Sequence, residues 1–382
     1  MSDTLGLYLH IPFCVRKCSY CDFCSTAADE ATRAAYVDAL CAHLIATAPT
    51  AQGRPVDTVY LGGGTPTILS EAQLSRILDT VRSAYTLTDD AEITAECNPV
   101  TGRDTLFEAL AAAGVNRLSI GVQSIHENEL ALLGRAHSFA DFLATLDAAL
   151  RAGLRNVSAD VMFGIPAQTV ESLAKTLDTL ASLPLTHLSA YGLRIEEGTP
   201  FDKNRDKLPF PDEDAEADMA ELVPTLLQKH GFARYEISNY ARNGARSRHN
   251  LRYWLGEEYL GFGPAAHSYF AGVRYATPPD TKAYIQAIAA GNLDALCSER
   301  HVLDAHEQRE EYVMLRMRLA EGIDKRDFAC RFGTSFEAAY GNLDALTQSG
   351  LLQSTDTHVT FSARGMQVSN AILSDWLDFK GE

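Results

Sequence analysis

Short hydrophobic runs alternate with longer amphipathic segments through the first half of the chain. The runs are rich in β-branched residues and predict strands at 5–10, 58–61, 92–96, 117–122, 157–163 and 187–191. The segments between them are rich in Ala and Leu, carry apolar residues at helical spacing, and predict helices at 33–48, 71–84, 106–113, 139–152 and 170–183. Five strand-to-helix steps in one direction predict right-handed crossovers and a parallel sheet.

A parallel sheet that curls into a full or partial barrel presents its chemistry at the carboxyl ends of its strands. Polar or small residues follow those ends here. One such residue would be unremarkable, because helix caps and buried carboxylates are common, but a whole ring of them indicates a site. The ring consists of Cys14, Cys18 and Cys21 after the first strand, Gly62–Gly63 with Gly64 and Thr65 after the second, Glu96 at the third, Gln123 after the fourth and Asp160 within the fifth.

The pattern changes in the second half of the chain. An acidic stretch at 212–221 opens an expected helix that ends near Gly231, which is typical of a solvated face with carboxylates at a helix N-terminus. The last segment predicts helices at 308–320, 325–332 and 336–349, strands at 351–354 and 359–361, and a helix at 364–377. This order resembles a winged-helix module. We therefore expect two domains, 1–280 and 281–382.

Charge and composition narrow the class of protein. Fifty acidic and 33 basic side chains give a formal charge of -17, and 46% of the residues are hydrophobic, as in ordinary soluble proteins. The acidic excess argues against nucleic acid as a partner, because Lys and Arg supply most of that affinity. No apolar run approaches the roughly 20 residues of a membrane span, and the N-terminus lacks the features of a secretory signal. We expect a cytoplasmic protein whose thiols stay reduced.

Four of the eight cysteines lie between Cys14 and Cys24. Structural zinc takes four ligands, and Cys24 or His10 would have to complete such a site beside Cys14-x3-Cys18-x2-Cys21. A 4Fe–4S cluster held by three cysteines needs no fourth ligand from the chain and leaves one iron open. The cysteine spacing favours the cluster, and a structural zinc protein is the alternative.

This spacing, between a first strand and an Ala-rich helix, resembles the radical S-adenosylmethionine (SAM) superfamily. The resemblance implies that Cys14, Cys18 and Cys21 bind a 4Fe–4S cluster whose open iron is chelated by SAM, and that Tyr20 lies beside the adenine. The glycine run that ends at Gly64 would let the backbone approach the methionyl group.

Several segments resemble the oxygen-independent coproporphyrinogen oxidase group more closely, among them LHIPFCVRKCSYCDF, LGGGTPT, SIGVQSI, LLGRAHS and SADVMFGIPAQT. The resemblance implies a radical SAM partial (β/α)6 barrel of TIM type. The carboxylates of Glu96 and Asp160 suit the ribose hydroxyls and the amine of SAM, and Arg135 suits the carboxylate of SAM. The implied SAM contacts are Tyr8, Tyr20, Gly63, Gly64, Thr65, Glu96, Gln123, Arg135 and Asp160, with Arg194 nearby.

Two branches of this group differ at the cluster. The oxidases, called HemN, carry a fourth cysteine two residues after the third and a longer N-terminal extension, whereas this chain has Phe23 at that position and thirteen residues before Cys14. The shorter branch, the HemW haem chaperone family, is marked by an H-N-x-x-Y-W segment, which is His249 to Trp254 here. Cys24 is either a bystander or an auxiliary redox thiol.

The HemW resemblance implies a haem site on that segment. Four arginines, 242, 246, 248 and 252, lie within eleven residues that contain no acid, and arginine pairs bidentately with carboxylates such as haem propionates. A solvated basic loop is the other interpretation. The implied haem contacts are His249, Asn250, Arg252, Tyr253 and Trp254, with His267 as a second axial candidate.

The predicted function is haem binding and delivery to acceptor haemoproteins, with a 4Fe–4S cluster, SAM and an electron donor. The enzyme alternative is radical decarboxylation of coproporphyrinogen III. A homodimer is possible. The sequence identifies neither the haem acceptor nor the haem ligand, and it does not show whether SAM is cleaved.

Overall fold

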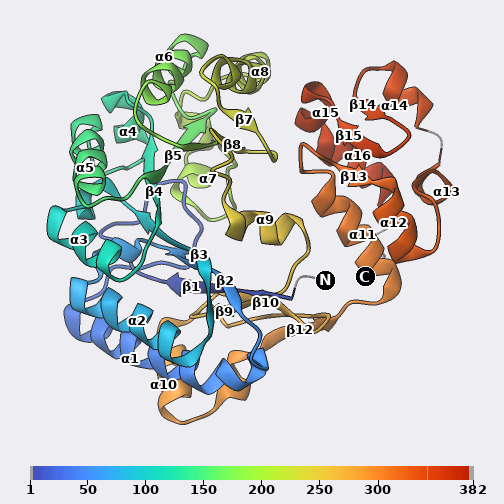
Figure 1. Cartoon of the computed structure of the whole chain (residues 1–382). Coiled ribbons are helices and arrows are strands. Elements are labelled where there is room, and N and C mark those ends of the chain that lie inside the picture. Colours follow the sequence, from blue (N-terminus) through green and yellow to red (C-terminus); the bar gives the residue numbers. More distant parts are fainter. Residues whose placement is uncertain (1–2, 342, 378–382) are drawn as a thin grey trace.

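The computed structural model describes residues 3–341 and 343–377, and a curved sheet with helices on its outer side dominates the fold (Figure 1). Six consecutive strands pair in parallel, in sequence order, as predicted. Each contains the strand expected from the hydrophobic runs, extended by one to five residues at one end or at both. They are β1 (Leu5–Ile11), β2 (Val56–Gly63), β3 (Leu87–Cys97), β4 (Arg117–Gln123), β5 (Asn156–Phe163) and β6 (His187–Gly192).

The crossover helices begin at polar caps that the sequence supplies. Ser70 and Ser138 each accept a hydrogen bond from the backbone N–H of the third helical residue, whose side chain bonds back to the cap, so two otherwise unpaired donors are satisfied. The apolar faces pack on the sheet and form one continuous core with it. These helices are α1 (Glu30–Thr47), α2 (Glu71–Ala84), α3 (Asp104–Ala112), α5 (Phe139–Arg151) and α6 (Val170–Ala181).

Additional strands extend both edges of the sheet and were not predicted. On one side β9 (Tyr259–Phe262) pairs in parallel with β1, and β10 (His267–Phe270), β11 (Val273–Ala276) and β12 (Ser298–Val302) follow in antiparallel order. On the other side β8 (Asn239–Ala241) pairs with β6, and β7 (Ala233–Arg234) pairs with β8. The remaining helices before the C-terminal elements are α4 (Glu127–Leu132), α7 (Pro200–Lys203), α8 (Glu213–Lys229), α9 (Arg248–Trp254) and α10 (Thr281–Ala289).

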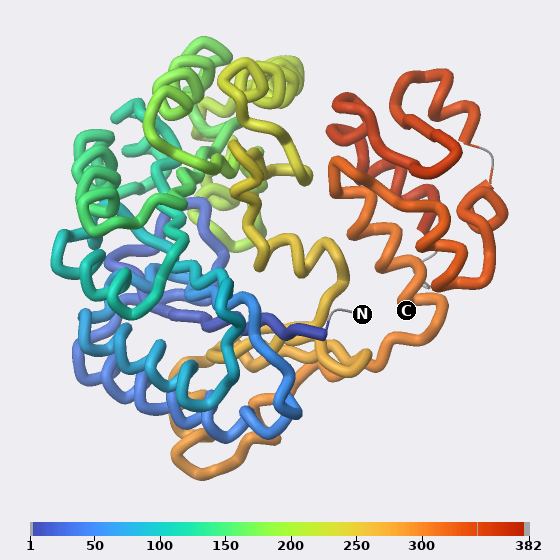
Figure 2. The backbone as a smooth tube through the Cα atoms, in the orientation of Figure 1, coloured from blue at the N-terminus to red at the C-terminus, as the bar shows by residue number. Residues whose placement is uncertain are grey.

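The helix α9 connects the two edges of the curved sheet. The chain leaves β8 on one side, passes through α9 and reaches β9 on the other, and this segment is the yellow part of the tube in Figure 2. The backbone N–H of Arg248 and that of His249 both donate to the carboxylate of Glu92, so the first turn of α9 is fixed to β3. This also satisfies donors that a helix start leaves unpaired.

The C-terminal elements form a second, smaller core on one side of the sheet (Figures 1 and 2). Tyr284 and Leu296 still pack into the first core, while the second begins at Tyr312. The cores therefore separate further along the chain than the expected boundary at 280/281. The elements are α11 (Ala305–Arg316), β13 (Ile323–Asp324), α12 (Lys325–Phe332), α13 (Phe336–Tyr340), α14 (Asp344–Gln348), β14 (Leu352–Ser354), β15 (His358–Phe361), α15 (Ala363–Gln367) and α16 (Ser369–Trp376).

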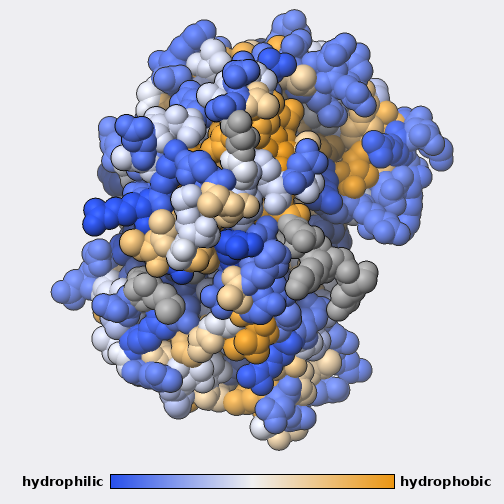
Figure 3. All heavy atoms as spheres, turned by 90° about the vertical axis from the view of Figure 1, so that its right-hand side faces the viewer, coloured by the Kyte–Doolittle hydropathy of each residue, from blue (hydrophilic) through white to orange (hydrophobic). Residues whose placement is uncertain are grey.

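Two of the long helices predicted in the C-terminal segment are each divided into two shorter helices. The expected helix 336–349 is split into α13 and α14, because Gly341 follows α13 with a φ of 77°, a left-handed conformation that ends a helix. The expected helix 364–377 is likewise divided into α15 and α16. Among the described residues, no helix is long and apolar enough to cross a membrane. Figure 3 shows the side of the molecule that carries the C-terminal elements, and this side is mostly hydrophilic, with apolar residues in separate groups.

Candidate cluster and cofactor site

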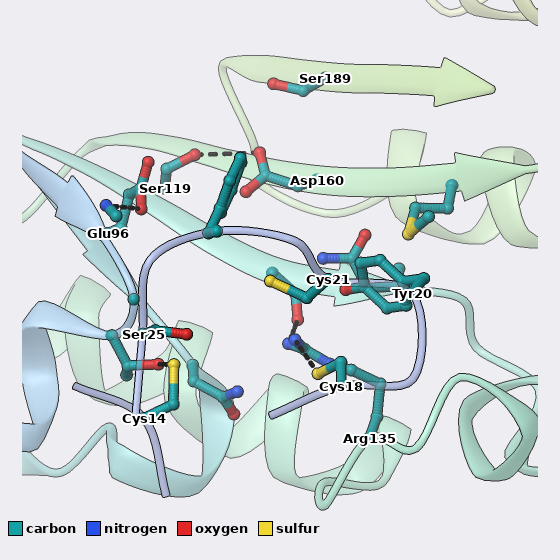
Figure 4. A pocket seen from close by; sticks show the side chains of 18 of the residues that line it. Cys14, Cys18, Tyr20, Cys21, Ser25, Glu96, Ser119, Arg135, Asp160 and Ser189 are labelled. Atoms are coloured by element: carbon teal, nitrogen blue, oxygen red, sulfur yellow. Dashed lines mark hydrogen bonds between the residues drawn. The ribbon is translucent and has the colours of Figure 1, made fainter. Parts of the chain in front are cut away.

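A cavity of about 480 Å³ opens at the carboxyl ends of the parallel strands (Figure 4). All three predicted cluster cysteines line it, and so do eight of the nine predicted SAM contacts, Tyr8 being the exception. The sequence argument predicted this convergence, because the carboxyl ends of parallel strands meet at one edge. The lining residues among the predictions are Cys14, Cys18, Tyr20, Cys21, Gly63, Gly64, Thr65, Glu96, Gln123, Arg135 and Asp160.

The loop that carries the cysteines is fixed to its surroundings by backbone hydrogen bonds. The N–H of Cys14 donates to the carbonyl of Thr26 at 3.1 Å, which closes the base of the loop. At its far side the N–H of Ser19 donates to Leu133 O at 3.1 Å, and the Arg16 guanidinium donates to Gly134 O at 2.7 Å. The loop is therefore positioned by the segment after α4.

The three thiols share the cavity wall and have polar neighbours. Cys14 Sγ lies 3.5 Å from Thr65 Oγ1, and Arg135 Nη1 donates to Cys18 Sγ at 3.6 Å. Burial raises the pKa of Cys21, and the neighbouring Cys18 and Cys14 raise it further, as expected when negative charges would face one another. A positively charged iron cluster would reverse this penalty.

The donor set fits a cluster held by three thiolates. All three cysteines are free and partly exposed to the cavity, and iron–sulfur clusters are held by cysteine thiolates. Among the described residues, no three or more His, Cys, Asp or Glu side chains are gathered as ligands of a single metal ion would be. Cys24 does not line the cavity, and its thiol donates to Pro279 O at 3.6 Å. His10 bonds to the Cys24 carbonyl at 2.8 Å and supports the loop.

The glycine run after β2 is packed directly against the cysteine loop. The N–H of Gly64 donates to Ile11 O at 2.9 Å, and the N–H of Thr65 donates to Phe13 O at 2.7 Å. A Cβ at Gly64 would stand 2.6 Å from Phe13 O, closer than real Cβ contacts. Glycine is required here because the two backbones touch, in addition to any approach of a ligand.

Two half-buried carboxylates, Glu96 and Asp160, line the cavity. Glu96 accepts from the Tyr60 hydroxyl at 2.8 Å and from the Gly63 N–H at 3.1 Å, and Asp160 accepts from the Ser119 hydroxyl at 3.0 Å. Burial raises the pKa of Glu96 to about 7, with Asp160 adding to the rise. Burial also raises the pKa of Asp160. Both can accept hydrogen bonds from a polar ligand, and Glu96 can do so in either protonation state near neutral pH.

Gln123 and Arg135 lie at the carboxyl end of β4. Gln123 has a φ of 65°, which is unusual for a residue with a side chain, and such conformations persist where the surroundings impose them. Its amide oxygen accepts from the Tyr191 hydroxyl at 3.2 Å. Arg135 Nη2 donates to Gly121 O at 2.5 Å while its Nε has no partner among the described residues. An unpaired buried donor beside the cysteines can receive an anionic ligand group.

The two predicted aromatic contacts differ in position. Tyr20 lines the cavity and packs 6.3 Å from the Phe201 ring. Tyr8 lies outside the cavity lining, beside the rings of Tyr60 and His249, with its hydroxyl 3.1 Å from His10 Nδ1. Tyr8 therefore supports the cavity wall through other side chains.

The H-N-x-x-Y-W segment is the helix α9, and its histidine is buried. His249 is 1% exposed, with Nδ1 2.9 Å from Thr58 Oγ1 and Nε2 2.7 Å from the Tyr253 hydroxyl. Burial lowers the pKa of His249 to about 3, and Arg252 lowers it further. Because both ring nitrogens are engaged, neither is available to haem iron in this conformation. Asn250 lines the cavity floor, and His267 is exposed at the start of β10.

The four arginines of the acid-free stretch are each engaged with protein acceptors. Arg246 pairs with Glu321 at 2.7 Å, Arg248 with Asp90 at 3.2 Å, and Arg252 with Asp57. Arg242 donates to two backbone carbonyls and covers the ring of Phe232. The predicted propionate clamp is therefore not preformed, because carboxylates distant in the sequence already meet three of these cations.

Comparison with known proteins decides the family. The chain is 37% identical to the heme chaperone HemW of Escherichia coli, over 98% of each chain. It is 35% identical to the heme chaperone HemW of Bacillus subtilis, over 97% of this chain and 98% of that one. The chain belongs to the HemW family. This confirms the resemblance seen in the cysteine and H-N-x-x-Y-W segments.

Two family descriptions and one solved structure agree with HemW membership. The Radical SAM superfamily matches residues 8–180, and the HemN C-terminal domain matches residues 303–368. The structure of coproporphyrinogen III oxidase (HemN) from Escherichia coli superposes with a TM-score of 0.86 at 24% identity, covering 98% of this chain and 90% of that one. This likeness concerns the fold, and it confirms the predicted class of a radical SAM partial barrel with a small C-terminal domain. Membership implies a 4Fe–4S cluster and SAM.

The site of this HemW family member also contains side chains that the sequence argument missed. The cavity is lined by Tyr60, Arg117, Ser119, Ser189, Asn239 and others. Arg117, Ser119 and Ser189 sit inside strands rather than after them, so a search limited to strand ends passes over them. Alternation along β4 would have found Arg117 and Ser119, because they share a face with Gln123.

Proposed function

We propose that this protein binds haem and delivers it to acceptor haemoproteins in the cytoplasm, and that it does so while holding a 4Fe–4S cluster and SAM. The observation that carries the proposal is the near full-length similarity to proteins named heme chaperone, in a chain whose three loop thiols share one cavity. An external electron donor for the cluster and a homodimeric state are further parts of this proposal.

The cavity residues suit the two cofactors in distinct ways. Cys14, Cys18 and Cys21 would hold three irons, and SAM bound to the fourth would supply a carbon radical when the cluster passes it an electron. Arg135 would receive the ligand carboxylate through its unpaired Nε. Glu96 and Asp160 would accept from the ribose hydroxyls and the amine. The fixed positions of these six side chains would orient the ligand without rearrangement.

For haem, the surface at Trp254 is a better candidate than His249. Trp254 lines a second cavity, of about 420 Å³, between α9 and the C-terminal domain, together with Tyr312 and Phe332. Arg316 also lines it, 5.3 Å from the Tyr312 ring centre, and its Nε has no partner among the described residues. Arg331 lies at the same distance from that ring but pairs with Asp327 at 2.9 Å. Flat aromatic faces beside guanidinium groups suit a porphyrin ring with carboxylate arms.

Haem titration of the anaerobically reconstituted protein tests haem binding at the Trp254 surface and the exclusion of His249 as a ligand. We expect a saturable Soret shift that Trp254→Ala and Arg316→Gln weaken by at least fivefold. His249→Gln should leave the affinity of the folded protein within twofold of wild type. Arg151→Gln is the matched control, because Arg151 is an exposed arginine at the end of α5 and does not line this cavity.

A transfer assay tests delivery. Haem-loaded protein is mixed with an apo-haemoprotein, and recovery of the acceptor's activity is compared with that from free haem at the same concentration. The proposal predicts faster recovery from the loaded protein. Conversion of coproporphyrinogen III to protoporphyrinogen IX, with 5'-deoxyadenosine formed in step, would instead establish the oxidase alternative.

A further inference from the structure

A buried arginine without a partner lies on the floor of the cofactor cavity. Arg117 is the first residue of β4 and is 1% exposed, yet it lines the cavity. The expected SAM contacts on this strand and just beyond it are Gln123, at its carboxyl end, and Arg135. Arg117 and Gln123 are six positions apart along β4, roughly 20 Å of extended backbone. Arg117 therefore belongs to the deep end of the cavity.

The Arg117 guanidinium has no hydrogen-bond or ion-pair partner among the described residues, and its Nε is buried and unsatisfied. A guanidinium carries five N–H donors and keeps its charge in proteins. Burying such a group without an acceptor is strongly unfavourable. Compare Arg252, which is equally buried but pairs with Asp57 and two backbone carbonyls.

The side chains around Arg117 leave room for an acceptor. Glu96 and Asp160 lie close enough for the Arg117 charge to oppose the rise in the pKa of each. Neither bonds to Arg117, since Glu96 accepts from Tyr60 and Gly63 and Asp160 accepts from Ser119. Asn239, 8% exposed, has an amide oxygen without a partner. Small polar groups complete the floor: Ser119, Ser189, Ser238, Asn239 and Asn250.

We propose that Arg117 anchors a second ligand subsite, below the SAM site, which binds a carboxylate group. A planar guanidinium matches a carboxylate bidentately, and the side-chain amide of Asn250 lies on the same floor. The carboxylate belongs either to a small free anion or to the propionate arm of a larger ligand. The subsite goes beyond haem delivery and stands whether or not the protein transfers haem.

The test measures binding of propionate to the cluster-reconstituted, full-length protein by calorimetry, at fixed ionic strength. Propionamide, its neutral analogue, and chloride serve as comparison ligands. We expect saturable binding of propionate that is at least tenfold tighter than binding of either comparison. Arg117→Gln should weaken propionate binding at least tenfold, while Arg151→Gln, at an exposed arginine that does not line the cavity, should change it less than twofold.

Two further arms locate the subsite and identify the source of the carboxylate. Propionate binding that persists with unchanged affinity in saturating SAM supports a separate subsite, and competition between the two would assign Arg117 to the SAM site and overturn the proposal. Haem that displaces propionate, with haem dimethyl ester failing to do so, identifies a propionate arm. Displacement by neither identifies a small anion.

A structural role for Arg117 gives a different result. Equal effects of propionate, propionamide and chloride, or unchanged propionate affinity in Arg117→Gln, would refute the subsite. If Arg117→Gln does not fold, Arg117→Lys keeps the charge and loses the bidentate geometry. We expect Arg117→Lys to fold and to bind propionate several-fold more weakly, and wild-type affinity in that variant would also overturn the proposal.

Discussion

Replacing Arg252 by alanine should destabilise the protein strongly, although this residue lies in the segment expected to bind haem. The Arg252 side chain is 2% exposed, and it pairs with Asp57 on β2 and with Glu257 at 3.4 Å. It also donates to the carbonyls of Thr4 and Glu258, which flank β1 and β9. One guanidinium thus holds α9 to three strands.

The expected loss of stability follows from the carboxylate that Arg252→Ala leaves without its ion-pair partner. Asp57 is 16% exposed, so the substitution leaves a largely buried carboxylate whose remaining partners are peripheral. Removing one member of a buried ion pair costs about 3–5 kcal/mol. Arg151, by contrast, is 55% exposed and pairs with two exposed aspartates, so Arg151→Ala should cost about 0–1 kcal/mol.

Anaerobic urea unfolding, followed by far-UV circular dichroism, compares the three proteins. We expect Arg252→Ala to lower the free energy of unfolding by at least about 3 kcal/mol relative to wild type. Arg151→Ala should lower it by less than about 1 kcal/mol. A loss below about 1 kcal/mol in Arg252→Ala, with the slope against urea unchanged, would refute the role assigned to this ion pair.

Three further predictions concern the cofactor cavity and α9. Gly64→Ala should push the cysteine loop away from the β2 end, lower the free energy of unfolding by about 1–3 kcal/mol and lower the iron and sulfide content after reconstitution. Gly192→Ala, whose Cβ would meet its nearest atom at 3.2 Å, should retain the iron and the sulfide. His249 stays neutral in the folded protein down to about pH 3, so unfolding takes up a proton below about pH 6.5 and stability falls as the pH decreases. His249→Gln should make that slope shallower by about 1.4 kcal/mol per pH unit in urea unfolding at pH 4–6; an unchanged slope contradicts the assignment. SAM affinity should rise with pH through about 7, where Glu96 ionises and accepts stronger hydrogen bonds. Calorimetry at pH 6 and 8 should show this rise in the wild type and not in Glu96→Gln. A wild-type affinity that is the same at both pH values would argue against a hydrogen bond from SAM to Glu96.

Local pattern predicted the elements that depend on local rules. The six parallel strands and five crossover helices follow from hydrophobic periodicity, and the cavity follows from the rule that such strands end together. The split of the expected helix 336–349 depended on the φ of one glycine, Gly341, which periodicity does not report.

The haem site depended on contacts between distant parts of the chain. The stretch 242–252 contains no acid, so its arginines looked available, yet Asp57, Asp90 and Glu321 reach it from elsewhere in the fold. His249 was expected at a ligand site and instead bonds to Thr58, 191 residues away. A local charge pattern cannot distinguish an exposed basic loop from one that tertiary structure neutralises.

The pairing of β1 with β9 constrains the order of events during synthesis. Residues 6–9 of β1 pair with residues 259–262, so one edge of the first strand stays unpaired until about two thirds of the chain has been made. Domains fold from the N-terminus as the chain emerges from the ribosome, but β1 leads directly into the cysteine loop and cannot be enclosed that early. The backbone partners of the loop, Thr26 and Leu133, are made earlier, so it is the strand that carries the loop, and not the loop itself, that is completed late, when β9 pairs with β1.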